Sequence, residues 1–270
     1  MSTVVGGNDQ AEGLRNIFGA ELCRVICIAS TLDADSTIHL GHGTAQSLKQ
    51  HNNHVLLVDE IPLAQRKTMS GFLYPTRYDL GQVFNNAVPL ARSIRQIDEY
   101  LWYATSTKLR SEVEHRFAKY PQLDARLVQE QMGIDYVIFP TIDPQAQIVA
   151  FYGSNIQRIL VTAGDQASLS KALVMLRQMA IFQVDEPLAV IIVGGEDEAA
   201  GTAAFEKLQN AARSALHEEI EFIGWIAAVT ARRVALDPDD QSWNPPSDGP
   251  QEEFVLPMGF FKAISAKISS

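Results

Sequence analysis

The side chains best suited to chemistry lie close together between residues 30 and 60. Two carboxylates, Asp33 and Asp35, are followed by the imidazoles of His39 and His42, three residues apart on a predicted helix. Carboxylate and imidazole both bind metals, but a metal centre needs a closed ligand set, and this pattern defines no third ligand. We therefore predict no metal site. No Ser/His/Asp or paired-carboxylate arrangement has a diagnostic setting either, so we assign no catalytic residue.

The chain has two cysteines, Cys23 and Cys27. This number rules out a disulfide framework and fits a reducing, cytoplasmic compartment. We expect both cysteines to be inert buried thiols that face different sides of the first strand.

The segment that contains these carboxylates and imidazoles has the element order of a nucleotide-binding α/β unit. Residues 24–29 (RVICIA) and 54–59 (HVLLVD) are apolar runs of strand length, and residues 37–50 between them are predicted to be a helix. Apolar strands separated by a helix are typical of a parallel sheet covered on both faces. A phosphate-binding loop would lie directly after the first of these strands.

The same alternation continues along the chain. Further strands are predicted at residues 100–105, 135–139, 158–162, 188–193 and 222–226. Helical segments are predicted at residues 80–95, 109–131 (broken near Pro121), 168–179 (opened by Ser168) and 201–216. The pattern predicts one doubly wound α/β domain, with a mostly parallel sheet and helices on both faces.

The composition excludes several classes of protein. The 270 residues include 22 Lys+Arg and 32 Asp+Glu, a net charge of −10, which argues against direct binding to nucleic acid. No apolar run approaches the ~20 residues that span a bilayer. Residues 1–10 have neither the basic stretch nor the apolar run of a secretory signal.

The C-terminal part has a different composition. Residues 237–256 are acidic and proline-rich and predict an irregular, disordered linker. Residues 257–270 then form a potential amphipathic helix, in which Phe260, Phe261, Ile264 and Ile268 share one face. This tail is similar to the membrane-targeting helix of MinD proteins. Its candidate membrane-binding residues are Phe260, Phe261, Lys262, Ile264, Lys267 and Ile268. Docking of this helix on its own domain or in a dimer interface is the alternative.

The unit at residues 24–59 resembles the opening of the MinD/ParA group of P-loop ATPases, whose deviant phosphate loop reads G-K-G-G-x-G-K-T. The overlay places the glycines on Thr31, Asp33, Ala34 and Ser36, the lysines on Leu32 and Thr37, and the magnesium-binding threonine on Ile38. Phosphate binding needs glycines for close backbone approach and lysines for charge. The resemblance therefore implies a pseudo-ATPase with no nucleotide cofactor.

Other motifs of the group are altered as well. Asp59 is the one acid kept from its D-x-D motif. Pro140, followed by Thr141, stands where the Walker B strand usually ends in aspartate. Ala227 replaces a usual proline in the loop that contacts the nucleotide base.

The N-terminal string resembles the DQAxGLR motif of the FlhG (FleN) proteins within this group. It comprises Asp9, Gln10, Ala11, Glu12, Gly13, Leu14 and Arg15. In that family the segment activates FlhF, a signal-recognition-type GTPase that places flagella. The resemblance implies that residues 9–15 dock as a short helix and that Gln10 reaches towards the partner's nucleotide site.

The sequence thus predicts a regulator of flagellar number or placement that stimulates the FlhF GTPase without hydrolysing ATP. The expected organisation is a partner-activating motif (1–20), a MinD-like domain (21–236), a linker (237–256) and a C-terminal helix (257–270). The expected location is the cytoplasm, with peripheral association at the inner membrane or cell pole. Further partners that remain open are flagellar switch (C-ring) proteins and a flagellar transcription regulator. A homodimer remains open as the oligomeric state. The alternatives are a diverged active ATPase and a MinD-fold scaffold of a pilus or cellulose-secretion machine.

Overall fold

The protein is described by a computed structural model. It describes residues 23–67, 71–84, 87–108, 123–124, 132–144, 151–152, 156–180, 188–226, 229–231 and 253–255. The predicted motif at residues 9–15, the C-terminal segment 257–270 and Ala227 lie outside these residues.

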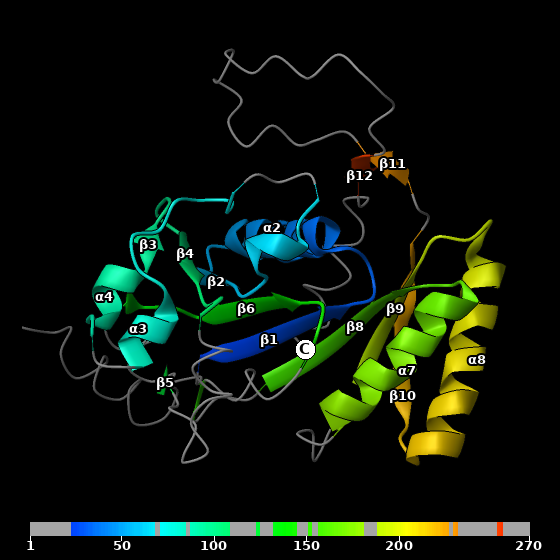
Figure 1. The fold of residues 1–270 in the computed structure, drawn as a ribbon. Helices are drawn as coiled ribbons and strands as arrows, with labels where there is room; N and C mark the ends of the chain where they lie inside the picture. The colour runs from blue at the N-terminus through cyan, green and yellow to red at the C-terminus, as the bar shows by residue number, and fades with distance from the viewer. Residues whose placement is uncertain are drawn as a thin grey trace, which may run out of the picture.

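An eight-stranded sheet organises the fold, in the order β10-β9-β8-β1-β6-β2-β4-β3 (Figure 1). Its strands are β1 (Arg24–Ser30), β2 (Val55–Asp59), β3 (Arg95–Gln96), β4 (Leu101–Thr105), β6 (Tyr136–Thr141), β8 (Ile156–Ala163), β9 (Leu188–Val193) and β10 (Ile220–Ile226). All neighbouring strands are parallel except the edge pair β3–β4. The predicted doubly wound, mostly parallel sheet is confirmed.

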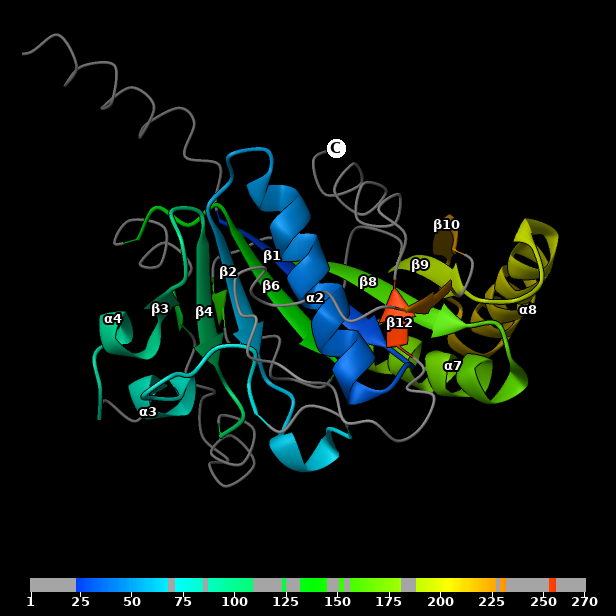
Figure 2. The same ribbon diagram turned by 90° about the horizontal axis from the view of Figure 1, so that it is seen from above.

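Helices cover both faces of this sheet (Figure 2). The helical elements are α2 (Ala34–Lys49), η1 (Leu63–Gln65), α3 (Leu80–Phe84), α4 (Leu90–Ser93), α7 (Gln166–Ala180) and α8 (Glu198–Leu216). On one face, α2 packs Ile38 and Leu48 into the cluster that contains Ile26. On the other face, α7 and α8 pack over β8 and β9, and α3 packs beside β2.

Burial explains why these elements form. The residues of β2 are all fully buried, as are Leu176 of α7 and Ile38 of α2. Each buried aliphatic side chain of this size contributes about 1.5–3 kcal/mol relative to exposure. Among the described residues, no helix combines the length and apolar character needed to cross a membrane.

Three expectations need correction. Leu123–Asp124 form β5 and pair in parallel with β7 (Phe151–Tyr152), so the helix predicted over 109–131 is wrong at these two residues. Helix α7 begins at Gln166, because the Asp165 carboxylate accepts the Ser168 amide at 3.0 Å. Glu253–Val255, within the predicted linker, form β12, which pairs antiparallel with β11 (Val229–Ala231). Pairing between distant segments decides such short strands, and local composition does not reveal it.

The two cysteines are both buried, as expected, but they do not face different sides. Successive side chains of a strand alternate between the two faces. Ile26 and Ile28 pack on the α2 side, whereas Cys23 and Cys27 both belong to clusters of the opposite face. The prediction was wrong because residues four apart in a strand share a face.

Candidate functional site

The candidate site lies where the parallel strands end. From β1 the chain passes to β2 and β4 on one side, and later to β8, β9 and β10 on the other. Ligands of open α/β sheets bind at such a reversal, outside the carboxyl ends of the strands. An open cavity of about 380 Å³ lies here, lined by Leu32, Ala200 and residues 163–165 and 193–195.

The loop after β1 is held by hydrogen bonds within the chain. The Thr31 amide donates to the Val161 carbonyl at 3.0 Å, and its hydroxyl donates to Thr162 Oγ1 at 2.9 Å. The Leu32 amide donates to Ser30 Oγ at 3.1 Å. These amides are therefore already engaged inside the protein.

Asp33 is the N-cap of α2. Its Oδ1 accepts the Ser36 amide at 2.9 Å, and its Oδ2 accepts the Ser36 hydroxyl at 2.7 Å. The Asp33 carbonyl accepts both the amide and the hydroxyl of Thr37. The start of a helix is a natural anion site, because its free amides and dipole favour negative charge. Here the chain's own carboxylate occupies that site, so α2 begins at Ala34, three residues before the predicted start.

The remaining loop positions are parts of the core. Ile38, at the expected magnesium position, is fully buried, and Ala34 is buried in the same cluster. Leu32, at the signature lysine position, packs partly against that cluster. These apolar side chains cannot bind phosphate or a hard cation.

Three helices, α2 on one face of the sheet and α7 and α8 on the other, share the same kind of cap. Because α2, α7 and α8 each follow a parallel strand, they begin at the same edge of the sheet. Asp33 caps α2, Asp165 caps α7, and Asp197 caps α8 by accepting the Ala200 amide at 2.8 Å. Hydrogen bonds from Ser168 lower the pKa of Asp165. This edge is therefore lined by carboxylates at positions where a phosphate would otherwise be favoured.

One cation reaches the loop from α7. Lys171 Nζ donates to the Thr31 carbonyl at 3.2 Å. Burial lowers the pKa of Lys171, while the charges of Asp143 and Asp33 oppose this shift. Sequence reasoning missed Lys171, because 140 residues separate it from its partner.

Pro140 takes the position of the expected Walker B aspartate. It is buried in β6 opposite Ile28 of β1. The pairing of β6 with β2 ends at Ile138, opposite Leu57, which suits Pro140 because proline has no backbone donor. The next side chain, Thr141, accepts the Asp143 amide at 3.2 Å.

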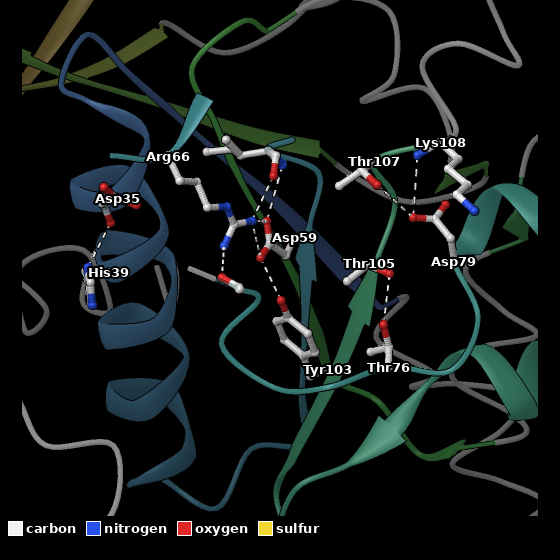
Figure 3. A network of polar contacts seen from close by, with 12 residues as sticks. Asp35, His39, Asp59, Arg66, Thr76, Asp79, Tyr103, Thr105, Thr107 and Lys108 are labelled. Carbon is white, nitrogen blue, oxygen red and sulfur yellow. Dashed lines mark hydrogen bonds and ion pairs between the residues drawn. The ribbon is translucent and has the colours of Figure 1, made fainter. Parts of the chain in front are cut away.

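Asp59, the retained acid, has become half of a buried ion pair (Figure 3). Arg66 Nη2 lies 2.7 Å from both carboxylate oxygens, and the Tyr103 hydroxyl donates to Oδ2 at 2.6 Å. Burial raises the pKa of Asp59, and the hydrogen bonds from Arg66 and Tyr103 oppose this rise. Burial also raises the pKa of Tyr103, so the phenol remains a donor. A carboxylate in this state is unavailable to an external ligand.

The ion pair also fixes the segment after β2. Arg66 donates to the carbonyls of Ile61 and Gly71, and its guanidinium lies 5.0 Å from the centroid of the Phe72 ring. The Lys67 amide donates to Asp35 Oδ2 at 2.9 Å, which ties the same segment to α2. No sequence motif indicated Arg66 or Tyr103 as partners of Asp59.

A second buried carboxylate joins α3 to the end of β4. Asp79 accepts from the Gly81 amide at 2.8 Å. It also accepts from the Thr107 hydroxyl at 3.2 Å and from the Lys108 amide at 3.4 Å (Figure 3). Burial raises the pKa of Asp79, and these hydrogen bonds oppose the rise. Asp79 is thus a connection within the fold, and sequence reasoning did not single it out.

The histidines of α2 are occupied by structural contacts. His39 donates through Nδ1 to the Asp35 carbonyl at 2.8 Å, and His42 Nε2 lies 3.0 Å from the Tyr74 hydroxyl. Within the part of the chain that the structure describes, no group of three or more His, Cys, Asp or Glu side chains could hold a metal ion.

Comparison with known proteins identifies the fold. No family model matches the chain, and no curated protein matches it. Among solved structures, a McdA variant from Cyanothece in complex with ATP is similar, with a TM-score of 0.53 and 15% identity over 77% of this chain and 84% of that chain. A proposed plasmid partition protein from Borrelia burgdorferi bound to AMPPNP has a TM-score of 0.52 and 15% identity over 91% and 98%.

The MinC:MinD complex from Aquifex aeolicus is also similar, with a TM-score of 0.48 and 20% identity over 76% of this chain and 81% of that chain. Identities this low show similarity of fold alone. The sheet order and its covering helices define a MinD/ParA-like α/β fold of the P-loop NTPase type.

Proposed function

We propose that this chain is a MinD-type regulator of flagellar number or placement that does not hydrolyse ATP. It acts by binding and stimulating an FlhF-type GTPase through residues 9–15. The observation that carries the non-hydrolysing part is the Asp33 carboxylate at the start of α2, where a P-loop protein binds phosphate.

The charges and the side-chain types around Asp33 support the non-hydrolysing part of the proposal. A nucleotide phosphate would meet Asp33 directly, with Asp165 capping α7. At ~4 Å and an effective dielectric constant of ~20, repulsion by one such charge costs about 4 kcal/mol. Leu32 and Pro140 supply neither a cation nor a metal ligand. Two structures of similar fold contain ATP or AMPPNP, so the fold accommodates nucleotide when its loop is suitable.

The partner is inferred from the N-terminal motif. Residues 9–15 match the activator segment of the FlhG family in sequence, and a glutamine at position 10 can orient an attacking water without altering the charge. The hydrogen-bonded segments after β1 (residues 30–33) and after β2 (residues 60–67) then serve as a scaffold that needs no nucleotide to hold its shape.

The first experiment measures GTP hydrolysis by the FlhF-type GTPase with and without the full chain. We expect stimulation by the wild-type protein and loss of stimulation in Gln10→Ala. Gln65→Ala is the matched control, because Gln65 is an exposed glutamine on η1. Absence of stimulation by a folded wild-type sample would overturn the proposed partner.

The second experiment tests the ATP site. With millimolar Mg-ATP we expect no protein-dependent phosphate release and no change of molar mass in light scattering. Phosphate release that disappears on unfolding would instead identify a diverged ATPase. A mass increase with ATP would identify a nucleotide-controlled dimer.

The membrane part of the proposal concerns residues 257–270. Bulky apolar residues such as Phe260 and Phe261 would enter the lipid boundary, and the two lysines would meet anionic headgroups. Flotation with phosphatidylglycerol vesicles should recover the wild-type chain and lose the Phe261→Asp variant. Equal flotation of both proteins would show that residues 257–270 do not bind the membrane through Phe261.

A further inference from the structure

The segment from residue 61 to residue 97 has the opposite charge to the rest of the chain. It contains five basic residues and one acid, in a protein whose net charge is −10. Arg66 pairs with Asp59 in the interior, and the one acid, Asp79, is buried and hydrogen-bonded within the fold. The four remaining charged side chains are exposed and all basic, namely Lys67, Arg77, Arg92 and Arg95.

The three arginines lie at one end of the sheet, where Figure 1 shows α4 and β3 together. Arg95 is the first residue of β3, and its Nη1 donates to the Pro75 carbonyl at 2.8 Å. This bond brings the turn that precedes Arg77 against β3, and the Arg77 guanidinium lies 5.2 Å from the centroid of the Tyr78 ring. Arg92 is in α4, three residues before Arg95. We call Arg77, Arg92 and Arg95 the basic edge.

No carboxylate among the described residues forms an ion pair with the basic edge. The described ion pairs of arginine are Asp59–Arg66 and Arg213–Glu219. The turn between β3 and β4 holds two acids, of which Asp98 is bound to Lys49 at 2.6 Å. The positive charge of the basic edge is therefore available to a ligand from outside.

The same place is an open edge of the sheet. Strand β3 is the last in the sheet order and, of the strands that the structure describes, pairs with β4 alone. Both residues of β3 are exposed, and the extended backbone begins one residue earlier, at Ile94 (φ −105°, ψ 128°). An edge strand directs alternate N–H and C=O groups away from its neighbour, where an incoming strand can bind them.

These two features together define the chemistry of a ligand. Guanidinium groups bind carboxylates through paired hydrogen bonds. The backbone groups of a sheet edge bind another extended polypeptide, and neither a nucleic acid nor a lipid headgroup has the peptide groups to replace it. We propose that β3 and the basic edge bind an acidic, extended segment of a partner protein. This surface includes neither the start of α2 nor residues 9–15, so the inference is independent of the proposed function.

The test measures the binding of two fluorescein-labelled peptides to the full chain by fluorescence anisotropy. The first peptide is Glu-Thr repeated four times, which supplies carboxylates and backbone donors. The second is the same peptide N-methylated at every residue, which keeps the charge and removes the donors. We expect the first peptide to bind at least about threefold more tightly than the second. Its affinity should fall when sodium chloride is raised from about 50 to about 300 mM, because salt screens exposed charges.

Variants assign the binding to the basic edge. Arg77→Gln with Arg92→Gln removes two charges, leaves the hydrogen bond of Arg95 in place, and should weaken binding about tenfold. If this double variant does not fold, Arg92→Gln alone should weaken binding about threefold. Arg177→Gln with Lys207→Gln is the matched control, because it removes two exposed cations from α7 and α8, at the other end of the sheet (Figure 1). This control should bind like the wild type.

Several outcomes would overturn the inference. These are no binding by a folded wild-type chain, equal affinity of the wild type and the Arg77→Gln, Arg92→Gln variant, and equal affinity for the two peptides. Flotation with phosphatidylglycerol vesicles that depends on these arginines, without peptide binding, would assign the surface to lipid. Peptide binding that appears only after Asp237, Asp239 and Asp240 are all changed to Asn would assign the surface to the chain's own acidic stretch.

Discussion

Pro140 of β6 lies directly against the backbone of Gly41 of α2. A Cβ atom at Gly41 would be 2.6 Å from Pro140 Cγ and 2.8 Å from Pro140 Cβ. The proline at the expected Walker B position therefore determines how closely α2 approaches the sheet. This contact joins two segments about a hundred residues apart.

Gly41→Ala tests this close approach. In an unhindered helix, alanine is about 1 kcal/mol better than glycine. Here the clash should reverse the sign, because overpacking typically costs about 1–3 kcal/mol. We expect a net loss of unfolding free energy, measured by urea denaturation. Adding Pro140→Ala should recover most of the loss, whereas a Gly41→Ala protein as stable as wild type would contradict the packing.

The buried pair Asp59–Arg66 should be costly to break from one side. Arg66→Met leaves a buried carboxylate without its cation and should lower stability by about 3–5 kcal/mol. The partly exposed pair Lys49–Asp98 provides the control, because Lys49→Met should cost at most about 1 kcal/mol. Urea denaturation measures both variants. Replacing both partners, as Asp59→Asn with Arg66→Met, should recover much of the loss. Equal losses of stability in Lys49→Met and Arg66→Met would contradict the special role of the buried pair.

His42 should make stability depend on pH. Burial, together with the charges of His39 and Lys49, lowers the pKa of His42 from 6.5 to about 4. The unfolded chain therefore binds a proton below pH 6.5 that the folded chain refuses, so stability falls from pH 6.5 down to about 4. At pH 5 the loss from this group is about 2 kcal/mol.

Urea denaturation at pH 8 and pH 5 measures this effect. His42→Gln should remove about 2 kcal/mol of the difference between the two pH values. His51→Gln, at an exposed position after α2, is the matched control and should keep the difference. An unchanged difference in His42→Gln would show that another group is responsible.

Both thiols should be unreactive in the native protein. Burial raises the pKa of Cys23 to about 12, and it also raises the pKa of Cys27. With Ellman's reagent at pH 8 we expect no rapid reaction before unfolding and two equivalents in guanidinium chloride. Rapid modification of either thiol in the folded protein would contradict its burial. Comparing Cys23→Ala with Cys27→Ala would identify the reactive group.

Several features could be predicted from the sequence because their causes are local. The apolar runs of β1, β2 and β9 predict buried parallel strands, and their spacing leaves room for covering helices. The position of the loop after β1 and its lack of glycine and lysine are also visible in the residues themselves. Element bounds were less accurate at helix starts, where Asp33, Asp165 and Asp197 extend the helices by capping them.

The site itself required the tertiary structure. Asp33 and Asp59 could both be named as acids of a nucleotide-type loop, but their actual roles differ. Asp33 caps its own helix, whereas Asp59 is paired with Arg66 and accepts a hydrogen bond from Tyr103. Identical side chains thus serve different purposes, because their partners are supplied by other strands and loops.

The sequence by itself determined the layered α/β architecture and the absence of glycine and lysine from the loop after β1, since hydrophobic period and residue identity are properties of short segments. Only the tertiary structure decided which groups meet at the start of α2 and at the end of β6. Lys171 meets Thr31 across 140 residues, and Pro140 meets Gly41 only after β6 has paired with β1. Such contacts depend on chain folding that brings distant groups within a few ångströms, where hydrogen bonding and steric repulsion act.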